Sequence, residues 1–135
     1  MEQEDRLKKQ IDQLGKVLGK ILADLLGIKN QGDASISIDT IFVSFKTELD
    51  IDLEELIECP TDQLIEKLKT EKGFSPVHME LLADILYTLE DGNDPGRQCD
   101  CMERALTIYE YSQMIDNNYS FERMNKINRI KTFLN

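Results

Sequence analysis

The chain has 135 residues, of which 41% are apolar, and a formal net charge of −10 at pH 7. This length predicts one domain over residues 1–135 with a single core, and no metal, cofactor or disulfide is needed to explain its folding. The negative charge argues against nucleic acid as a partner, because phosphate binding requires clustered Lys and Arg. Three cysteines, an acidic start and the lack of an apolar run of about 20 residues indicate a soluble, cytoplasmic protein that does not enter membranes.

The charge is unevenly distributed along the chain. Residues 33–116 hold twenty acidic and six basic side chains, whereas residues 117–135 hold four basic and one acidic. A basic end can be attracted to an acidic middle within one fold, or it can make contacts between chains.

The first predicted element is a long N-terminal helix within residues 1–29. Its apolar residues recur at alternating intervals of four and three, as in a bundle or coiled-coil helix: Leu7, Ile11, Leu14, Leu18, Ile21 and Leu25. Gly15 and Gly19 each cost roughly 1 kcal/mol relative to alanine in a helix, so we expect another backbone to approach closely there. That approach is either a tight crossing within the chain or a homodimer interface, made by Leu7, Ile11, Leu14, Gly15, Leu18 and Gly19.

Short helices are predicted over residues 33–73. The segment Ser35 to Leu49 fits either a strand or a helix, and we expect a helix because no other segment offers a strand partner. Asp52 followed by Glu55 has the pattern of a capping box, and Cys59-Pro60 interrupts the helix that follows. Thr61 is expected to cap the next helix.

Acidic side chains are concentrated in the run from Glu48 to Glu58. Such a run is the solvated side of short helices or a surface that receives a basic partner. The sequence leaves both interpretations open.

A helix pair and a final helix are predicted over residues 75–134. Ser75-Pro76 and Asp94-Pro95 each place a capping residue before a proline, which marks the start of each helix of the pair. In the second helix we expect an outward face made by Asp100, Glu103, Arg104, Thr107 and Glu110. Ser120 is expected to cap the final helix, with an apolar face of Phe121, Met124, Ile127, Ile130 and Leu134 and a basic face of Arg123, Lys126, Arg129 and Lys131.

The helix pair resembles a tetratricopeptide repeat. Met79-x2-Leu82-Ala83-x2-Leu86 is similar to the first helix of that repeat, and Ala105-x3-Tyr109 to the second. With Gln10-Ile11-x2-Leu14-Gly15-Lys16-x-Leu18 and Tyr119-Ser120-Phe121-Glu122-Arg123, the chain also resembles a family of short, uncharacterised bacterial helical proteins. The resemblance implies an all-α fold of six or seven helices in a short repeat-like array with a long N-terminal helix, and no known activity.

The repeat resemblance also implies a binding face. In such a repeat Val77, Glu80, Asp84 and Tyr87 would line a concave surface, and two carboxylates beside an aromatic ring suit a basic peptide or an Arg-bearing segment. The alternative is ordinary solvent exposure of the same residues.

Residues for catalysis or metal binding are sparse. His78 is the only histidine, and in the first turn of a helix it is expected to make local polar contacts. Cys99 and Cys101 diverge by about 200° on a helix, so they cannot hold one ion together. We therefore expect a non-enzymatic interaction or scaffold module that uses an acidic helical surface to bind a protein or peptide partner. The alternative is a small homo-oligomeric structural protein that dimerises through its N-terminal helix.

Overall fold

The structure is a computed structural model that describes residues 2–30, 38–89 and 94–135, with side chains for 13–27, 39–89 and 94–135. Within these ranges the chain is all helical. The helices are α1 (Glu2–Asn30), α2 (Ile38–Leu49), α3 (Leu53–Glu58), α4 (Thr61–Thr70), α5 (Pro76–Thr88), α6 (Pro95–Ile115) and α7 (Phe121–Leu134). This result confirms the predicted all-α class and the long N-terminal helix, whereas the repeat-like character stays a prediction.

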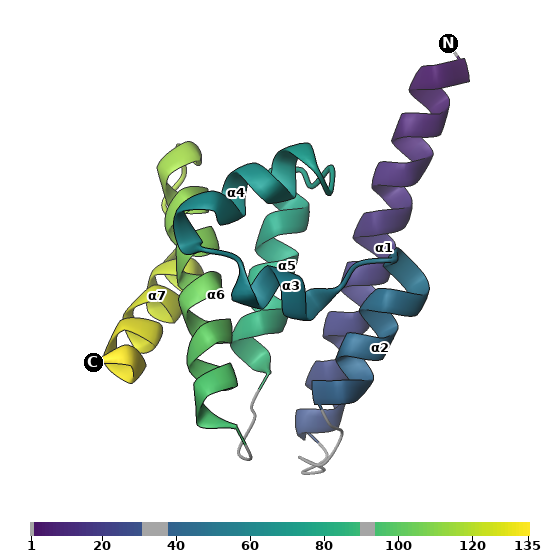
Figure 1. Cartoon of the computed structure of the whole chain (residues 1–135). Coiled ribbons are helices and arrows are strands. Elements are labelled where there is room, and N and C mark those ends of the chain that lie inside the picture. The colour runs from purple at the N-terminus through teal and green to yellow at the C-terminus, as the bar shows by residue number, and fades with distance from the viewer. Residues whose placement is uncertain (1, 31–37, 90–93) are drawn as a thin grey trace.

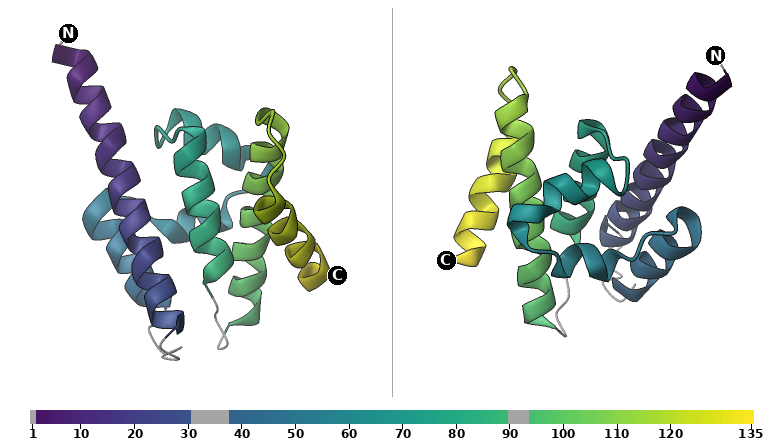
Figure 2. Two further views of the ribbon diagram at one scale, coloured as in Figure 1. Left: turned by 180° about the vertical axis from the view of Figure 1, so that it is seen from behind. Right: turned by 45° about the horizontal axis from the view of Figure 1, so that its top comes forward.

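The helices form two layers. In one layer α1 packs against α5, α5 against α6, and α6 against α7, so that these four helices lie side by side. The shorter helices α2, α3 and α4 lie across one face of this row (Figures 1 and 2) and contact α1 and α6. Helix α6 therefore has neighbours on several sides, which explains why its buried residues, among them Cys101, Met102, Ala105 and Tyr109, cover a wide arc of the helix.

The core is built from the apolar stripe of each helix. Its largest fully buried side chains come from both layers and include Leu18, Phe45, Leu56, Leu68, Leu82 and Tyr109. Because these residues recur at helical spacing, docking the helices removes all of them from water together, at about 25 cal/mol per Å² of apolar surface. The core thus fixes where α3, α4 and α5 present their polar faces.

Four of the predicted helix starts are confirmed. The side chains of Asp52, Asp94 and Ser120 accept hydrogen bonds from backbone amides at 3.1, 3.0 and 3.2 Å. Ser75 Oγ accepts from the His78 amide at 3.4 Å, and the His78 ring nitrogen Nδ1 accepts from the Ser75 amide at 3.1 Å. His78 is buried and completes this capping box, which is the local polar contact expected of it.

Two expectations for the short helices are wrong. Helix α4 begins at Thr61 itself, with Pro60 as its N-cap, because the Pro60 carbonyl accepts the Gln63 amide at 3.0 Å. Glu55, expected to close the Asp52 cap, instead forms an ion pair with Lys67 at 2.6 Å. The preference for a helix over a strand is confirmed for residues 38–49, and residues 35–37 lie outside the described ranges.

For three side chains the prediction of burial or exposure is wrong. Arg104, expected to face outward on α6, is 9% exposed, and Arg123, expected on the basic face of α7, is 7% exposed. Phe121, expected on the apolar face of α7, is 76% exposed. The two arginines are buried because each guanidinium meets several oxygen acceptors at a helix junction, which compensates its desolvation.

Candidate functional site

Arg104 of α6 contacts the turn between α3 and α4 through its guanidinium group. Its Nε and Nη2 atoms donate hydrogen bonds to the Cys59 carbonyl oxygen at 3.2 and 2.9 Å, while Nη1 lies 3.1 Å from Glu103 Oε2 and 3.6 Å from Asp100 Oδ1. Cys59 is the C-cap of α3, so this carbonyl has no partner within the helix. Arg104 therefore fixes the angle at which α3 and α4 meet.

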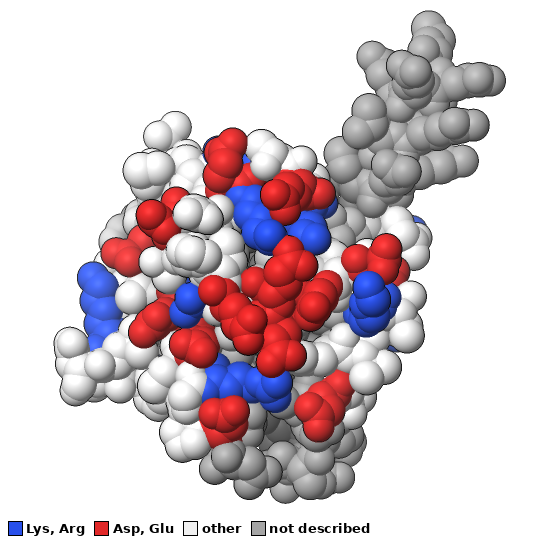
Figure 3. Space-filling view, in the orientation of Figure 1, with Lys and Arg blue, Asp and Glu red and all other residues white. Residues whose placement is uncertain are grey.

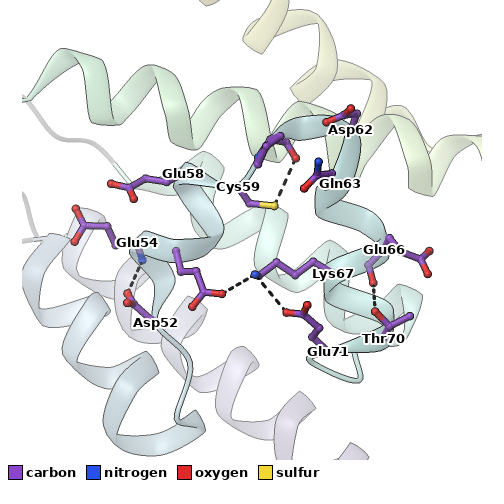
Figure 4. A pocket seen from close by; sticks show the side chains of 12 residues that line it. Asp52, Glu54, Glu58, Cys59, Asp62, Gln63, Glu66, Lys67, Thr70 and Glu71 are labelled. Atoms are coloured by element: carbon purple, nitrogen blue, oxygen red, sulfur yellow. Dashed lines mark hydrogen bonds and ion pairs between the residues drawn. The ribbon is translucent and has the colours of Figure 1, made fainter.

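A surface hollow of about 1000 Å³ lies where α3 and α4 meet (Figure 4). Seven acidic side chains and one basic side chain line it: Asp52, Glu54, Glu55, Glu58, Asp62, Glu66, Glu71 and Lys67. Figure 3 shows the same feature as a patch of acidic side chains in the middle of one face of the molecule. We call this feature the acidic hollow.

Lys67 stands among the carboxylates of the acidic hollow. Its Nζ atom lies 2.6 Å from Glu55 Oε1 and 3.3 Å from Glu71 Oε2. Hydrogen bonds that the ammonium group donates to these two carboxylates raise the pKa of Lys67, and the contact with Glu55 lowers the pKa of Glu55. Lys67 of α4 thus has its ammonium group between a carboxylate of α3 and the carboxylate of Glu71, the C-cap residue of α4.

The remaining carboxylates of the acidic hollow differ in how they are compensated. Glu54 Oε1 is 3.2 Å from Arg97 Nη2, and Asp52 caps α3. Glu58, Asp62 and Glu66 are exposed, and none of the three has an ion pair or a side-chain hydrogen bond with any residue in the described ranges. Figure 4 shows them along the upper and right rim of the hollow. Three negative charges there are available to an incoming cation.

The predicted concave face on α5 is separate from the acidic hollow, and α7 covers most of it. Val77 is 69% exposed. Glu80 pairs with Arg123 at 2.9 Å, Asp84 pairs with Lys126 at 3.0 Å, and the Tyr87 hydroxyl accepts from Arg129 at 3.4 Å. The Arg-bearing segment that this face was expected to bind is thus present within the chain.

The predicted interface residues of α1 include some that are buried within the chain and some whose side chains the structure does not describe. Leu18 is completely buried in the core and Leu14 is half-buried against it, whereas the side chains of Leu7 and Ile11 lie outside those that the structure describes. A methyl group added at Gly15 would lie 3.5 Å from the His78 ring, but one added at Gly19 would have no neighbour within 4 Å. The distance at Gly15 is an ordinary van der Waals contact with a side chain, so the expected close approach of another backbone is found at neither glycine within the described residues.

The cysteines and the single histidine remain apart from the acidic hollow except for Cys59. Cys59 and Cys101 are buried and Cys99 is half-buried, all as free thiols. Among the residues with described side chains, no three His, Cys, Asp or Glu are grouped as metal ligands would be. Each described helix also falls short of the combined length and apolarity needed to cross a bilayer.

Comparison with known proteins gives no relative: no family model, curated protein or solved structure matches the chain. The geometry of the acidic hollow and of the α7 contacts therefore carries the functional argument.

Proposed function

We propose that this protein is a non-enzymatic interaction module whose acidic hollow binds a basic segment of another protein. The observation that carries the proposal is that Glu58, Asp62 and Glu66 lie on one hollow and form no ion pair with any residue in the described ranges. Lys67 supports it, because its ammonium group already lies between the carboxylates of Glu55 and Glu71. A Lys- or Arg-rich segment would supply such groups to the remaining carboxylates.

The net charge of −10 favours the same class of partner. A negative field over one face attracts a basic segment before contact and weakens with added salt, since exposed charges are screened over about 8 Å at physiological ionic strength. Charge-assisted hydrogen bonds from Arg to carboxylates then fix its position. We expect the partner to be an extended or helical segment with several closely spaced cations.

The test is binding of fluorescein-labelled hexa-arginine, measured by fluorescence anisotropy. Replacing Glu58, Asp62 and Glu66 together by Gln, Asn and Gln should weaken binding by about tenfold to hundredfold, because each exposed charge pair contributes roughly 0.5–1 kcal/mol. The matched control replaces Asp24, Glu110 and Glu122 in the same way; these three are exposed and lie outside the hollow. Equal weakening by both triple variants would mean that the peptide follows net charge, and would contradict the proposal.

A second candidate function is a homodimer formed through α1. Figure 1 shows the N-terminal part of α1 extending beyond the other helices. Gly19 also lacks a contact within the chain that would explain a glycine. A second copy packed along α1 would supply that contact.

Light scattering of the purified protein tests the dimer. The dimer proposal predicts a mass twice the 15.6 kDa of one chain, and it predicts that Gly19→Leu returns the mass to 15.6 kDa, because a leucine would prevent close helix approach. Gly27→Leu is the matched control, since Gly27 is an exposed α1 glycine that also lacks a neighbour within 4 Å. A wild-type mass of 15.6 kDa at every concentration would rule the dimer out.

A further inference from the structure

Helix α7 docks through a face that is both basic and apolar. Ile127 and Ile130 are 4% and 1% exposed, and Arg123 of the same face is 7% exposed. Lys126 lies beside them and is half-buried. These residues occupy positions i, i+3, i+4 and i+7 of the helix, which is the spacing of one helical face.

The guanidinium of Arg123 is held by acceptors from two other elements. Its Nε and Nη2 atoms donate to the two Glu80 carboxylate oxygens at 3.0 and 2.9 Å, which is a bidentate pair. Nη2 also donates to Asp116 Oδ2, and Nη1 to Gln113 Oε1, both at 3.1 Å. All three nitrogen atoms are therefore bound, and the acceptors are set by α5 and the end of α6.

Lys126 is held in a cage of a different kind. Its Nζ atom lies 3.0 Å from Asp84 Oδ1 and 5.8 Å from the ring centroids of both Tyr87 and Tyr109. The two rings are nearly perpendicular, at 74°, and the Tyr109 hydroxyl donates a short hydrogen bond to the same Asp84 oxygen. Two aromatic rings and a carboxylate around one ammonium group match the chemistry of a lysine-binding cage.

The groups that bind these two cations belong to the body of the fold. Asp84 and Glu80 project from α5, and Tyr109 from the buried face of α6, where burial raises the pKa of the Tyr109 phenol and keeps it a hydrogen-bond donor. Helix α7 follows α6 through the link of residues 116–120 and acts as an intramolecular ligand at high effective concentration.

We propose that the face of α5 and α6 is a receptor for a basic amphipathic helix, which α7 occupies within the chain and a partner helix of the same pattern takes in its place. The pattern is Arg at i, Lys at i+3, and an aliphatic residue at i+4 and i+7. Glu80 selects the arginine and the cage of Asp84, Tyr87 and Tyr109 selects the lysine. This receptor is separate from the acidic hollow, and α7 limits access to it by competition.

The test uses the full chain with Arg123→Glu and Lys126→Glu, so that Glu80 and Asp84 repel α7. The probe is a fluorescein-labelled peptide with the sequence of residues 119–135. We expect it to bind this variant at least tenfold more tightly than it binds the wild-type chain, where α7 competes. A peptide carrying the same two reversals should bind at least tenfold more weakly than the wild-type peptide.

Two further variants locate the binding and separate it from the acidic hollow. Adding Glu80→Gln and Asp84→Asn to the released chain should reduce peptide binding at least tenfold, whereas adding Glu58→Gln, Asp62→Asn and Glu66→Gln should leave it within twofold. Circular dichroism checks that the released chain, the variant with Arg123→Glu and Lys126→Glu, is folded. If it is not, Lys126→Glu alone, which retains the Arg123 contacts, replaces it, and the peptide affinities of the variants are expected to rank in the same order. Equal binding to released and wild-type chains, or equal binding of the reversed peptide, would overturn the proposal.

Discussion

Replacing Arg123 by methionine is expected to make the docking of α7 less favourable by about 2–4 kcal/mol. The substitution removes four hydrogen bonds and leaves Glu80 and Asp116 without their cation. Breaking a fully buried pair costs about 3–5 kcal/mol, and the effect here should be smaller because the two carboxylates are about one third exposed. Hydrogen exchange of the α7 amides should accelerate by about 30-fold to 1000-fold, while the α5 amides change little.

The matched control for this prediction is Arg129→Met. Arg129 is exposed on the same helix and donates a long hydrogen bond, at 3.4 Å, to the Tyr87 hydroxyl, so its replacement should change α7 exchange by less than about threefold. Similar exchange rates in the two variants would contradict the role given to Arg123.

The pH dependence of stability also tests the contact between Arg123 and Asp116. The Asn118 amide and then Arg123 lower the pKa of Asp116 below its ordinary value, so the folded value is below the unfolded one. This stabilisation is present above about pH 4, the ordinary carboxyl pKa, and is lost as the pH falls through the folded value. In Arg123→Met only the Asn118 contribution remains, so the pH dependence from Asp116 should be smaller.

Replacing Arg104 by methionine should lower the free energy of unfolding by about 2–3 kcal/mol. Methionine fills similar space but leaves the Cys59 carbonyl oxygen without two charge-assisted hydrogen bonds, each of a kind that contributes about 1.5–3 kcal/mol. Asp100 and Glu103 can return to water because they are about half exposed, which limits the total. Urea denaturation followed by circular dichroism measures the change.

The same substitution should also weaken binding of hexa-arginine, although Arg104 does not line the acidic hollow. Loss of the Cys59 contact frees the angle between α3 and α4, so the carboxylates of the two helices no longer face one hollow. We expect at least a threefold weaker affinity in a variant that is still folded by circular dichroism. Unchanged affinity in that variant would show that the hollow does not depend on Arg104.

Local pattern was sufficient to predict most of the helices. Polar caps at Asp52, Ser75, Asp94 and Ser120 mark starts that the structure confirms, because a side-chain oxygen that accepts a backbone amide is a contact between near neighbours. Thr61 has the same chemistry, but Pro60 already begins that helix. Thr61 was therefore wrongly predicted as the N-cap because the neighbouring residue Pro60 takes that position, which is a local effect and not one of tertiary packing.

The two buried arginines could not be placed by residue type alone. Arg104 and Arg123 share helical spacing with buried neighbours, Arg104 with Cys101 and Ile108, and Arg123 with Ile127. That spacing indicates burial, whereas their charge indicates exposure. Each also has acceptors nearby in the chain, but the Cys59 carbonyl that binds Arg104 and the Glu80 carboxylate that binds Arg123 are 45 and 43 residues away, and no local pattern predicts these contacts.

The candidate site was predicted in part. For the acidic run from Glu48 to Glu58 the sequence leaves a solvated helix face and a surface for a basic partner both open, and Asp62, Glu66 and Glu71 join it only because the chain turns at Cys59-Pro60. On α5 the chemistry of an acidic and aromatic face was predicted, while its occupation by α7 depends on how α5, α6 and α7 pack. Such packing follows from tertiary contacts that helical periodicity does not specify.

The central claim is that the acidic hollow receives a basic segment. The most direct measurement is a nitrogen-15 NMR titration of the wild-type chain with hexa-arginine, at low and at physiological salt. We predict that the largest chemical-shift changes fall on residues 54–71, around Glu58, Asp62 and Glu66, and that they diminish with salt. Changes spread evenly over the exposed carboxylates of all helices, or the absence of changes at tenfold excess peptide, would contradict the claim.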